Sequence, residues 1–425
     1  MRTGAGRVIS HLLPEGLTPA ARTLLWGRGL RAFADGLVSL LLPAYLMTLG
    51  FSPFEVGVIA TATLLGSAAL TLWVGMAAHR FGRQQLLIAA SLLMILTGIG
   101  FLVETDYWPL LAIAFVGTLN PSSGDVSVFL PLEQALLAES VEDRYRTGVF
   151  AVYGLVGSLV AALGALAAGL PDLLRILVPM GLAQALRSMF AIYMGLGLAT
   201  FLLYRRMPLP AASVPRERQQ PLGKSKRIVL TLAALFSIDA FGGGFFVQSL
   251  LALWFFDRFG LSVSAAGSIF FWTGLLAAFS YPAAARLSRR FGLINTMVFT
   301  HLPSNLCLVL MPFVPSLWLA VALLLVRSAL SQMDVPTRTS YVMAVVTPAE
   351  RTAAASITSV PRSLASAVSP SIAGYLLTLS GFGWPLVIGG TIKAVYDLLL
   401  LVMFRRVRPP EEQVAVEPSA STPQR

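Results

Sequence analysis

The sequence predicts an all-α membrane protein with twelve transmembrane helices in two pseudo-symmetric six-helix bundles. Composition is the first observation, because 56% of the residues are hydrophobic and 12% are charged, whereas soluble domains carry about 25% charged residues. The second observation is a series of apolar runs long enough to cross a bilayer, and the third is an internal repeat. Since lipid offers the backbone no hydrogen-bonding partner, such runs must form helices.

The apolar runs define the expected helices. In the first half they cover residues 24–47, 55–78, 84–103, 108–137, 147–169 and 182–204. In the second half they cover residues 228–256, 263–285, 292–313, 316–346, 353–379 and 383–404.

Between the halves lies a proline-rich stretch, which cannot continue a helix and is predicted to be a solvated linker. The expected domains are a cytoplasmic N-terminal segment (1–23), a first bundle (24–204), a cytoplasmic linker (205–227), a second bundle (228–404) and a disordered cytoplasmic tail (405–425).

Short motifs recur along the chain at an interval of 210 residues. GFSPFEVG starts at Gly50 and GLSVSAAG starts at Gly260, while RFG occurs at 80–82 and again at 290–292. A repeat of this length is too long for a solenoid and indicates two homologous six-helix units. Two parallel halves of this kind are typical of one large transporter fold.

Positive charge gathers in segments that the helices place on one side. Lys and Arg lie in the two termini, the linker and the turns after the second and eighth helices, whereas the outer loops hold Arg175 and Arg258. The positive-inside rule then places both termini in the cytoplasm, and we expect a bacterial cytoplasmic (inner) membrane. The net charge of +11 reflects this orientation and not a nucleic-acid partner.

The turn after the second helix reads VGMAAHRFGRQQLL. It resembles the inner-loop signature of the major facilitator superfamily, a glycine followed by Asp-Arg and then Gly-Arg. Gly75, Arg80, Gly82 and Arg83 match, and His79 stands where the family usually has aspartate. The resemblance implies that this loop belongs to a cytoplasmic gate, in which a histidine supplies the aspartate's charge poorly. We expect Gly82 to permit the sharp reversal.

Ionisable side chains inside the expected helices are the candidate functional residues. A charge near the bilayer centre costs roughly 2.5–3.5 kcal/mol and needs a partner or a wet cavity. Asp125 is the first candidate for proton coupling, because it follows a proline and a glycine and has no opposite charge within one turn. Asp35 is the second. Glu133 lies near the inner end of its helix and is assigned to the gate.

The family resemblance implies that helices one, four, seven and ten line a central cavity. Charged and polar residues on the first and tenth helices are three or four positions apart, which places them on one face. The candidate substrate-cavity residues are Arg31, Asp239, Arg327, Asp334, Arg338 and Tyr341.

These stripes also have a structural interpretation. For Arg31 with Asp35, and for Asp334 with Arg338, the alternative to a functional role is neutralisation across one helical turn.

The last helix carries Lys393 and Asp397 at the same spacing, and a structural pair is favoured there. Arg28 is expected to snorkel to lipid headgroups, and Arg362 to pair with an acid on another helix.

The leading functional hypothesis is a secondary active transporter that performs proton-coupled efflux of amphipathic, drug-like compounds. One alternative is proton-coupled uptake of an organic anion or sugar, which the arginines support. An alternative of another class is a non-transporting membrane sensor. An enzyme is not expected, since no nucleophile, base or metal constellation is visible; the three histidines are isolated in the sequence and Cys307 is the one cysteine. The expected partners are a small solute, protons and the lipid bilayer, and a monomer without cofactor or metal is expected.

Overall fold

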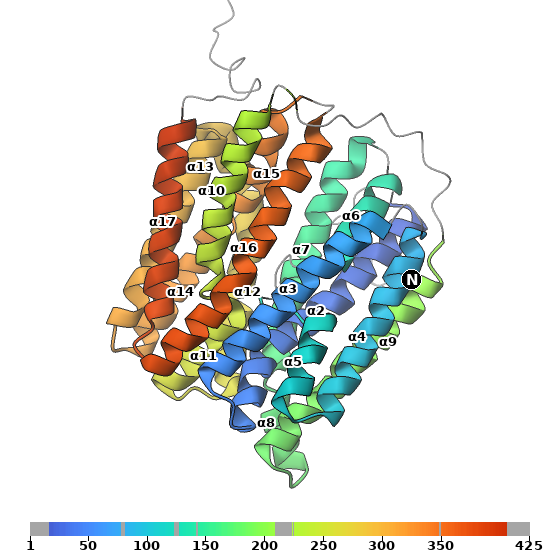
Figure 1. The fold of residues 1–425 in the computed structure, drawn as a ribbon, viewed down its shortest axis with the longest axis vertical. Helices are drawn as coiled ribbons and strands as arrows, with labels where there is room; N and C mark the ends of the chain where they lie inside the picture. Colours follow the sequence, from blue (N-terminus) through green and yellow to red (C-terminus); the bar gives the residue numbers. More distant parts are fainter. Residues whose placement is uncertain are drawn as a thin grey trace, which may run out of the picture. The chain divides into compact units, whose positions relative to one another are not determined.

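The computed structural model describes residues 17–77, 81–122, 127–141, 143–208, 223, 225–347 and 350–405, and the regular structure within them is helical (Figure 1). Ten helical segments of this described part are long and apolar enough to cross a membrane. The prediction of a multi-pass, all-α membrane protein is therefore confirmed.

The structure describes eight helices in the first sequence half. They are α2 (Pro19–Thr48), α3 (Pro53–Ala77), α4 (Arg83–Val103), α5 (Tyr107–Val116), α6 (Phe129–Glu139), α7 (Asp143–Ala167), α8 (Leu170–Leu177) and α9 (Leu182–Arg205). Thr18 shows how such a helix begins, because its hydroxyl accepts a hydrogen bond from the Ala21 amide while Pro19 takes the first helical position.

Helices of the second half follow the same order. They are α10 (Lys226–Gly244), α11 (Gln248–Phe259), α12 (Val263–Phe291), α13 (Leu293–Leu310) with a short 3-10 turn η1 (Met311–Phe313), α14 (Leu317–Ser331), α15 (Asp334–Ala344), α16 (Arg351–Leu379) and α17 (Trp384–Phe404).

The prediction of one continuous helix over 108–137 is wrong. Helix α5 ends at Val116 and α6 begins at Phe129. Between them, Pro121 has no amide hydrogen to give, and the side-chain oxygen of Asn120 accepts hydrogen bonds from the backbone and hydroxyl of Ser122. These local hydrogen bonds compete with the backbone hydrogen bonds of a helix at this position. The predicted tenth span is likewise divided between Ser331 and Asp334, and the seventh between Gly244 and Gln248.

Glycines with positive φ form some, but not all, of the sharp turns at the repeated motifs. Gly50 and Gly260 occupy the same place in the two halves, and both have positive φ values, +89° and +62°, which glycine adopts without strain. In the second RFG turn Gly292 also has positive φ, +84°. Gly82 has φ −61°, a conformation open to any residue, so the expectation that its flexibility makes the first turn is wrong.

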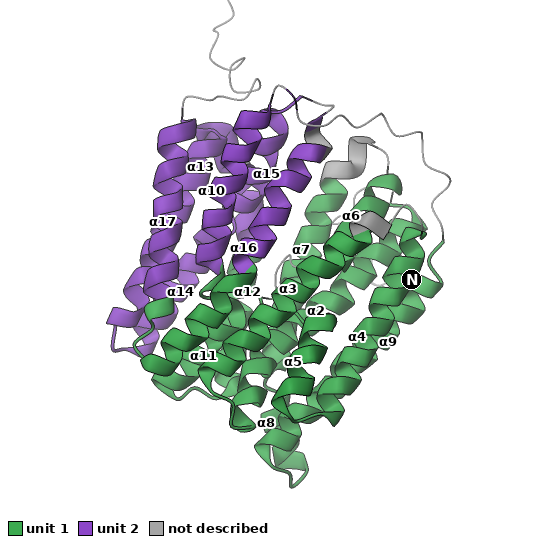
Figure 2. Cartoon of the chain, in the orientation of Figure 1, with its two compact units in different colours: residues 1–214, 244–278, 367–385 green, residues 215–243, 279–366, 386–425 purple. Residues whose placement is uncertain are grey.

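The chain divides into two compact units (Figure 2). Unit 1 comprises residues 1–214, 244–278 and 367–385, and unit 2 comprises residues 215–243, 279–366 and 386–425. The boundaries fall at residues 214/215, at the end of α10, within α12 and α16, and near the start of α17. Unit 1 therefore combines helices of the first sequence half with segments of the second.

In unit 1, α2 packs along α7 and α9. The backbones of α2 and α7 approach closely, because a Cβ atom at Gly36 would lie 1.9 Å from the carbonyl oxygen of Ala161, and one at Gly164 would lie 2.1 Å from that of Phe33. Small residues permit this packing inside lipid. In unit 2, α10, α13, α15 and α17 share an apolar core that includes Phe236, Met297, Tyr341, Tyr396 and Leu400.

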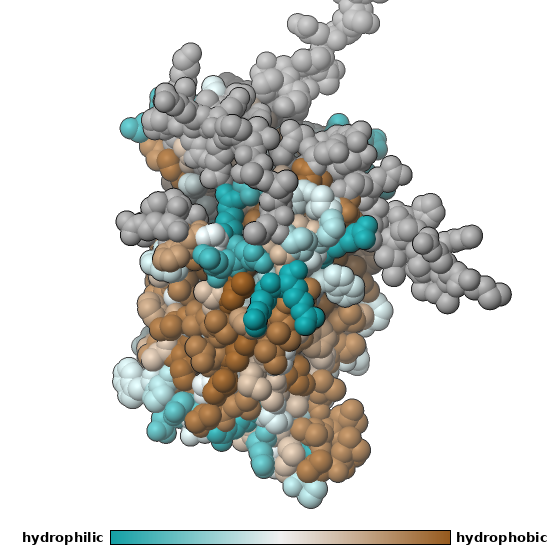
Figure 3. All heavy atoms as spheres, turned by 90° about the vertical axis from the view of Figure 1, so that its right-hand side faces the viewer, coloured by the Kyte–Doolittle hydropathy of each residue, from teal (hydrophilic) through white to brown (hydrophobic). Residues whose placement is uncertain are grey.

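The surface of unit 1 suits a hydrocarbon environment. Along α4 the side chains of Leu92, Leu96, Ile99 and Val103 are all exposed, and the face of the molecule that includes α4 and α9 is broadly hydrophobic (Figure 3). Exposed apolar residues in this density are costly in water and favourable in lipid.

Candidate functional site

Unit 1 holds a buried ionic cluster around Glu133 of α6. Arg31 of α2 donates to both oxygens of this carboxylate, with its Nε 3.0 Å from Oε1. The hydroxyls of Tyr153 on α7 and Tyr204 on α9 donate to the same carboxylate. All four side chains are buried. One guanidinium and two hydroxyls together compensate the charge of Glu133 within the membrane.

Arg28 and Asp35 lie on α2, one turn to either side of Arg31. Asp35 is 7% exposed, accepts a hydrogen bond from the Asn120 side chain and interacts electrostatically with both arginines. In the described part of the chain it forms a direct ion pair with neither, so Arg31 and Asp35 interact only through the electrostatic attraction between them. Arg28 is buried over the ring of Tyr153, 5.1 Å from its centroid. The expectation that Arg28 snorkels to headgroups is therefore wrong.

The predicted gate loop and the first candidate for proton coupling are only partly described. Gly75 lies in α3 and Gly82 precedes α4. His79, Arg80 and Asp125 lie outside the described residues.

Arg83 begins α4 and forms an ion pair with Glu139 at the end of α6. Both side chains are partly exposed, at 18% and 26%. This contact ties the predicted gate loop to the helix that carries Glu133.

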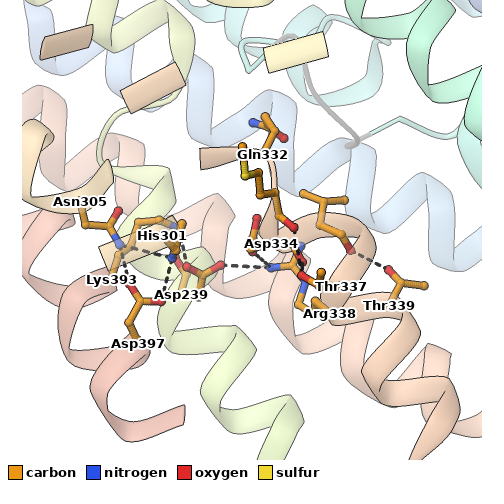
Figure 4. Close-up of polar contacts among 12 residues, drawn as sticks. Asp239, His301, Asn305, Gln332, Asp334, Thr337, Arg338, Thr339, Lys393 and Asp397 are labelled. Carbon is orange, nitrogen blue, oxygen red and sulfur yellow. Dashed lines mark hydrogen bonds and ion pairs between the residues drawn. The ribbon is translucent and has the colours of Figure 1, made fainter. Parts of the chain in front are cut away.

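Unit 2 holds a second ionic cluster, around Asp239 of α10 (Figure 4). Lys393 of α17 donates to Oδ1 of Asp239. Arg338 of α15 lies 3.4 Å from Oδ2 of Asp239 and donates to Asp334 across 2.9 Å. The four side chains are buried. The predicted pairing of Asp334 with Arg338 within α15 is confirmed, and Asp239 of α10 and Lys393 of α17 extend it to two more helices.

Asp397 of α17 has a partner other than the predicted one. His301 places Nδ1 2.8 Å from Oδ1 of Asp397, and Asn305 donates to Oδ2 across 2.8 Å. Because Lys393 is bonded to Asp239, the predicted pair of Lys393 with Asp397 is wrong. His301 is isolated in sequence but not in space.

For two other predicted cavity residues the structure shows contacts of another kind. Arg327 is in α14, where its backbone carbonyl accepts a hydrogen bond from Ser304 of α13. Tyr341 of α15 packs edge-on against Phe404 of α17, with ring centroids 6.1 Å apart. The break between α14 and α15 divides the stripe that the sequence suggested. Among the described residues, no group of three potential ligands is placed to hold a metal ion.

At the predicted cytoplasmic end of unit 2, Glu350 closes a loop outside the spans. It accepts hydrogen bonds from the Ser225 hydroxyl at 2.7 Å, from the Gly223 amide, and from the Thr347 hydroxyl at 2.9 Å. These donors favour the charged form and lower the pKa of Glu350 to about 2.

Comparison with known proteins identifies the family. A sequence model described as Major Facilitator Superfamily matches residues 24–327 and 233–423. The chain belongs to the major facilitator superfamily. As a major facilitator, it is a secondary transporter that binds a small-molecule substrate within the membrane.

Individual relatives agree with this membership. The structure of a bacterial homolog of the human lysosomal transporter Spinster, inward-facing and unoccupied, superposes with a TM-score of 0.69 at 14% identity, covering 91% of this chain and 96% of that one. An uncharacterized membrane protein of Saccharomyces cerevisiae is 25% identical over 420 residues, 90% of this chain and 93% of that one. A Na⁺, Li⁺, K⁺/H⁺ antiporter of Planococcus maritimus is 29% identical over 114 residues, 26% of each chain.

Several residues of this major facilitator escaped the sequence analysis. Tyr153 and Tyr204 complete the shell of Glu133, and Asn305 completes that of Asp397. Polar side chains within otherwise apolar helices were the available signal. Which helix faces them is a property of the tertiary structure.

Proposed function

We propose that this major facilitator is a proton-coupled transporter that exports an amphipathic organic solute in exchange for protons. The observation that carries the coupling is the state of Asp35. Glu133 and Asp239 are each held by a cation. Asp35 is buried, accepts a hydrogen bond from a neutral amide, and within the described residues forms no ion pair with the two nearby arginines. A carboxyl in this setting can release and regain a proton without breaking an ion pair.

Exchange, rather than uptake, is supported by a second observation. The antiporter of Planococcus maritimus resembles this chain over 114 residues at 29% identity. A proton that crosses about 100 mV yields roughly 2.3 kcal/mol, which is enough to export a solute against a modest gradient. Amphipathic character is proposed because α2, which carries Arg31 and Asp35, is otherwise largely apolar.

The experiment uses everted membrane vesicles with an imposed pH gradient and a fluorescent pH indicator. Addition of an exported cationic, amphipathic compound should dissipate the gradient, and Asp35→Asn and Asp125→Asn should abolish this response while the protein still inserts. The matched control is Asp106→Asn, because Asp106 is exposed before α5 and its side chain makes no capping bond. Full proton flux in both variants would remove these carboxyls from the mechanism.

A second candidate function is uptake of an organic anion. Arg28 favours it, because this guanidinium is buried and its Nε atom has no hydrogen-bonding partner among the residues that the structure describes. Buried guanidinium groups bind carboxylates and phosphates through two parallel hydrogen bonds. Two results together would favour uptake. Intact cells would accumulate labelled organic acids, and less so with Arg28→Gln, while vesicles would show no response to cationic compounds.

The proposal includes a bacterial cytoplasmic membrane and an orientation with both termini in the cytoplasm. It is supported by the lysines and arginines at the ends of the chain and in residues 205–227. Reporter fusions at the C-terminus test it, since a reporter that is active only outside the cytoplasm should stay silent there.

A further inference from the structure

Helix α8 of unit 1, which connects α7 to α9, presents apolar side chains to the outside of the protein. It lies below the lower end of α4 in Figure 1. Its sequence, LPDLLRIL, places the leucines on one face and the charged pair Asp172 and Arg175 on the other, because helical side chains three or four positions apart share a face. Ile176 is 81% exposed and Leu177 is 71% exposed. The exposed apolar side chains of this segment are Leu170, Leu173, Ile176, Leu177 and Val178.

The position of α8 relative to the bilayer follows from the length of the preceding span. The apolar stretch Gly148–Leu177 has 30 residues and would rise about 45 Å as one helix, whereas the hydrocarbon core is about 30 Å thick. Helix α7 ends at Ala167, after about 30 Å of helix counted from Gly148. The chain then turns at Gly169, whose amide donates to the carbonyl of Leu166 across 3.2 Å. Helix α8 therefore begins where the hydrocarbon core ends.

Contacts within unit 1 fix the rotation of α8 about its own axis. The carboxylate of Asp172 accepts a hydrogen bond from the hydroxyl of Ser264 on α12. The two segments approach closely here, because a Cβ atom at Gly169 would lie 3.0 Å from the hydroxyl oxygen of Ser264. Helix α9 also packs against α8. With Asp172 turned toward α12, the opposite, leucine-bearing face points away from the protein.

The apolar face of α8 could meet water, another protein or lipid. Contact with water is unfavourable by about 25 cal/mol for each Å² of apolar surface. A specific protein interface takes roughly 800 Å² from each partner, which is more than one face of a two-turn helix offers. Lipid requires no minimum area, so it is the neighbour that the size of this face favours.

The lipid-facing surface of unit 1 continues to α8. Helix α4, with its exposed Leu96 and Val103, packs along α9, and α9 packs against α8. Arg175 is exposed on the polar face of α8, where a guanidinium reaches headgroup phosphates while its stem lies along apolar surface. A helix with one apolar and one charged face lies in the boundary between headgroups and acyl chains.

We propose that α8 is an interfacial helix and that its partner is the bilayer surface on the side that the charge distribution assigns to the outside. Its apolar side chains enter the acyl region, and Arg175 stays with the phosphates. Because Asp172 binds Ser264, the first turn of α12 is tied to this lipid-seated helix. The inference goes beyond the proposed proton coupling and does not depend on it.

The direct test measures the surroundings of single spin labels on the full-length chain in lipid nanodiscs. In a Cys307→Ser background, Leu177→Cys reports the apolar face and Arg175→Cys the polar face. Leu96→Cys on α4 is the reference for hydrocarbon. The accessibility of each label to oxygen, which partitions into lipid, is compared with its accessibility to a water-soluble nickel chelate.

We expect the oxygen-to-nickel ratio at Leu177→Cys to be several-fold above that at Arg175→Cys and to correspond to a depth of about 5–10 Å, shallower than Leu96→Cys. Equal ratios at the two faces would place α8 in water and overturn the proposal. Low accessibility to both reagents at Leu177→Cys would show that protein covers the face, and would overturn it as well. Ile176→Cys is a second reporter of the apolar face, should Leu177→Cys not fold.

A pair of polar substitutions tests the apolar face itself. With the label kept at Ile176→Cys, Leu170→Ser/Leu173→Ser should move it toward water and lower its oxygen-to-nickel ratio. The matched control is Leu163→Ser/Leu166→Ser, because these leucines are exposed at the same spacing on α7, inside the expected span. The control should leave the ratio unchanged. An unchanged ratio in the α8 variant, or an equal fall in both variants, would contradict the proposal.

Discussion

Gln248 of α11 donates a hydrogen bond to the hydroxyl of Ser39 on α2 across 2.9 Å. Both residues belong to unit 1, although they come from different halves of the sequence. The hydroxyls of Thr61 on α3 and Ser371 on α16 make a second contact of this kind, at 2.7 Å. Transporters built from two repeats work by moving one repeat against the other, so contacts between the halves are expected to form and break during the cycle.

A disulfide at the second contact should arrest transport. In a Cys307→Ser background, the double variant Thr61→Cys/Ser371→Cys is expected to crosslink readily on oxidation, because the native oxygen atoms lie 2.7 Å apart. Oxidation should remove most solute flux, and a reductant should restore it. The single variants serve as controls, and the oxidant should not change their solute flux. Undiminished flux in a fully crosslinked sample would show that these helices need not separate.

Glu133→Gln should destabilise the protein strongly. It leaves Arg31 buried without its carboxylate, and the loss of one partner of a buried ion pair costs about 3–5 kcal/mol. The same substitution at Glu139 is the matched control, because its partner Arg83 is partly exposed and such pairs contribute about 0–1 kcal/mol. Unfolding measured in detergent should separate the two variants, and equal losses would contradict the ionic explanation.

Stability should depend on pH through Glu350. Hydrogen bonds from Ser225 and Gly223 lower the pKa of Glu350 to about 2, from an ordinary value of 4.5. A lowered pKa in the folded state contributes stability that is complete above about 4.5 and is lost as the pH falls toward about 2. In Glu350→Gln the loss of stability between about pH 4.5 and pH 2 that comes from this carboxylate should be absent.

The unfolding temperatures of wild type and Glu350→Gln, measured between pH 6 and 2, test this effect. Glu104→Gln is the control, because the side chain of Glu104 forms no hydrogen bond in the described part of the chain. Parallel profiles for wild type and Glu350→Gln would show that the loop does not bind the charged form preferentially.

The two RFG turns should respond differently to alanine. Gly292 has φ +84° and ψ 163°, a region that side chains avoid, so Gly292→Ala should cost about 1–3 kcal/mol. Gly82 has φ −61°, so Gly82→Ala should be neutral or should stabilise by about 0.4–1 kcal/mol through the unfolded chain. Thermal unfolding of both variants provides the comparison, and a larger loss at Gly82 would contradict the backbone argument.

The sequence by itself determined the helical membrane class, the order of the spans and the repeat, because hydropathy and glycine position act locally. The partner of each buried charge was decided by tertiary structure. Spacing along α2 suggested Asp35 for Arg31, and spacing along α17 suggested Asp397 for Lys393, but both cations reach acids on other helices. Helical periodicity fixes the face on which a charge lies, whereas the packing of whole helices fixes what that face meets.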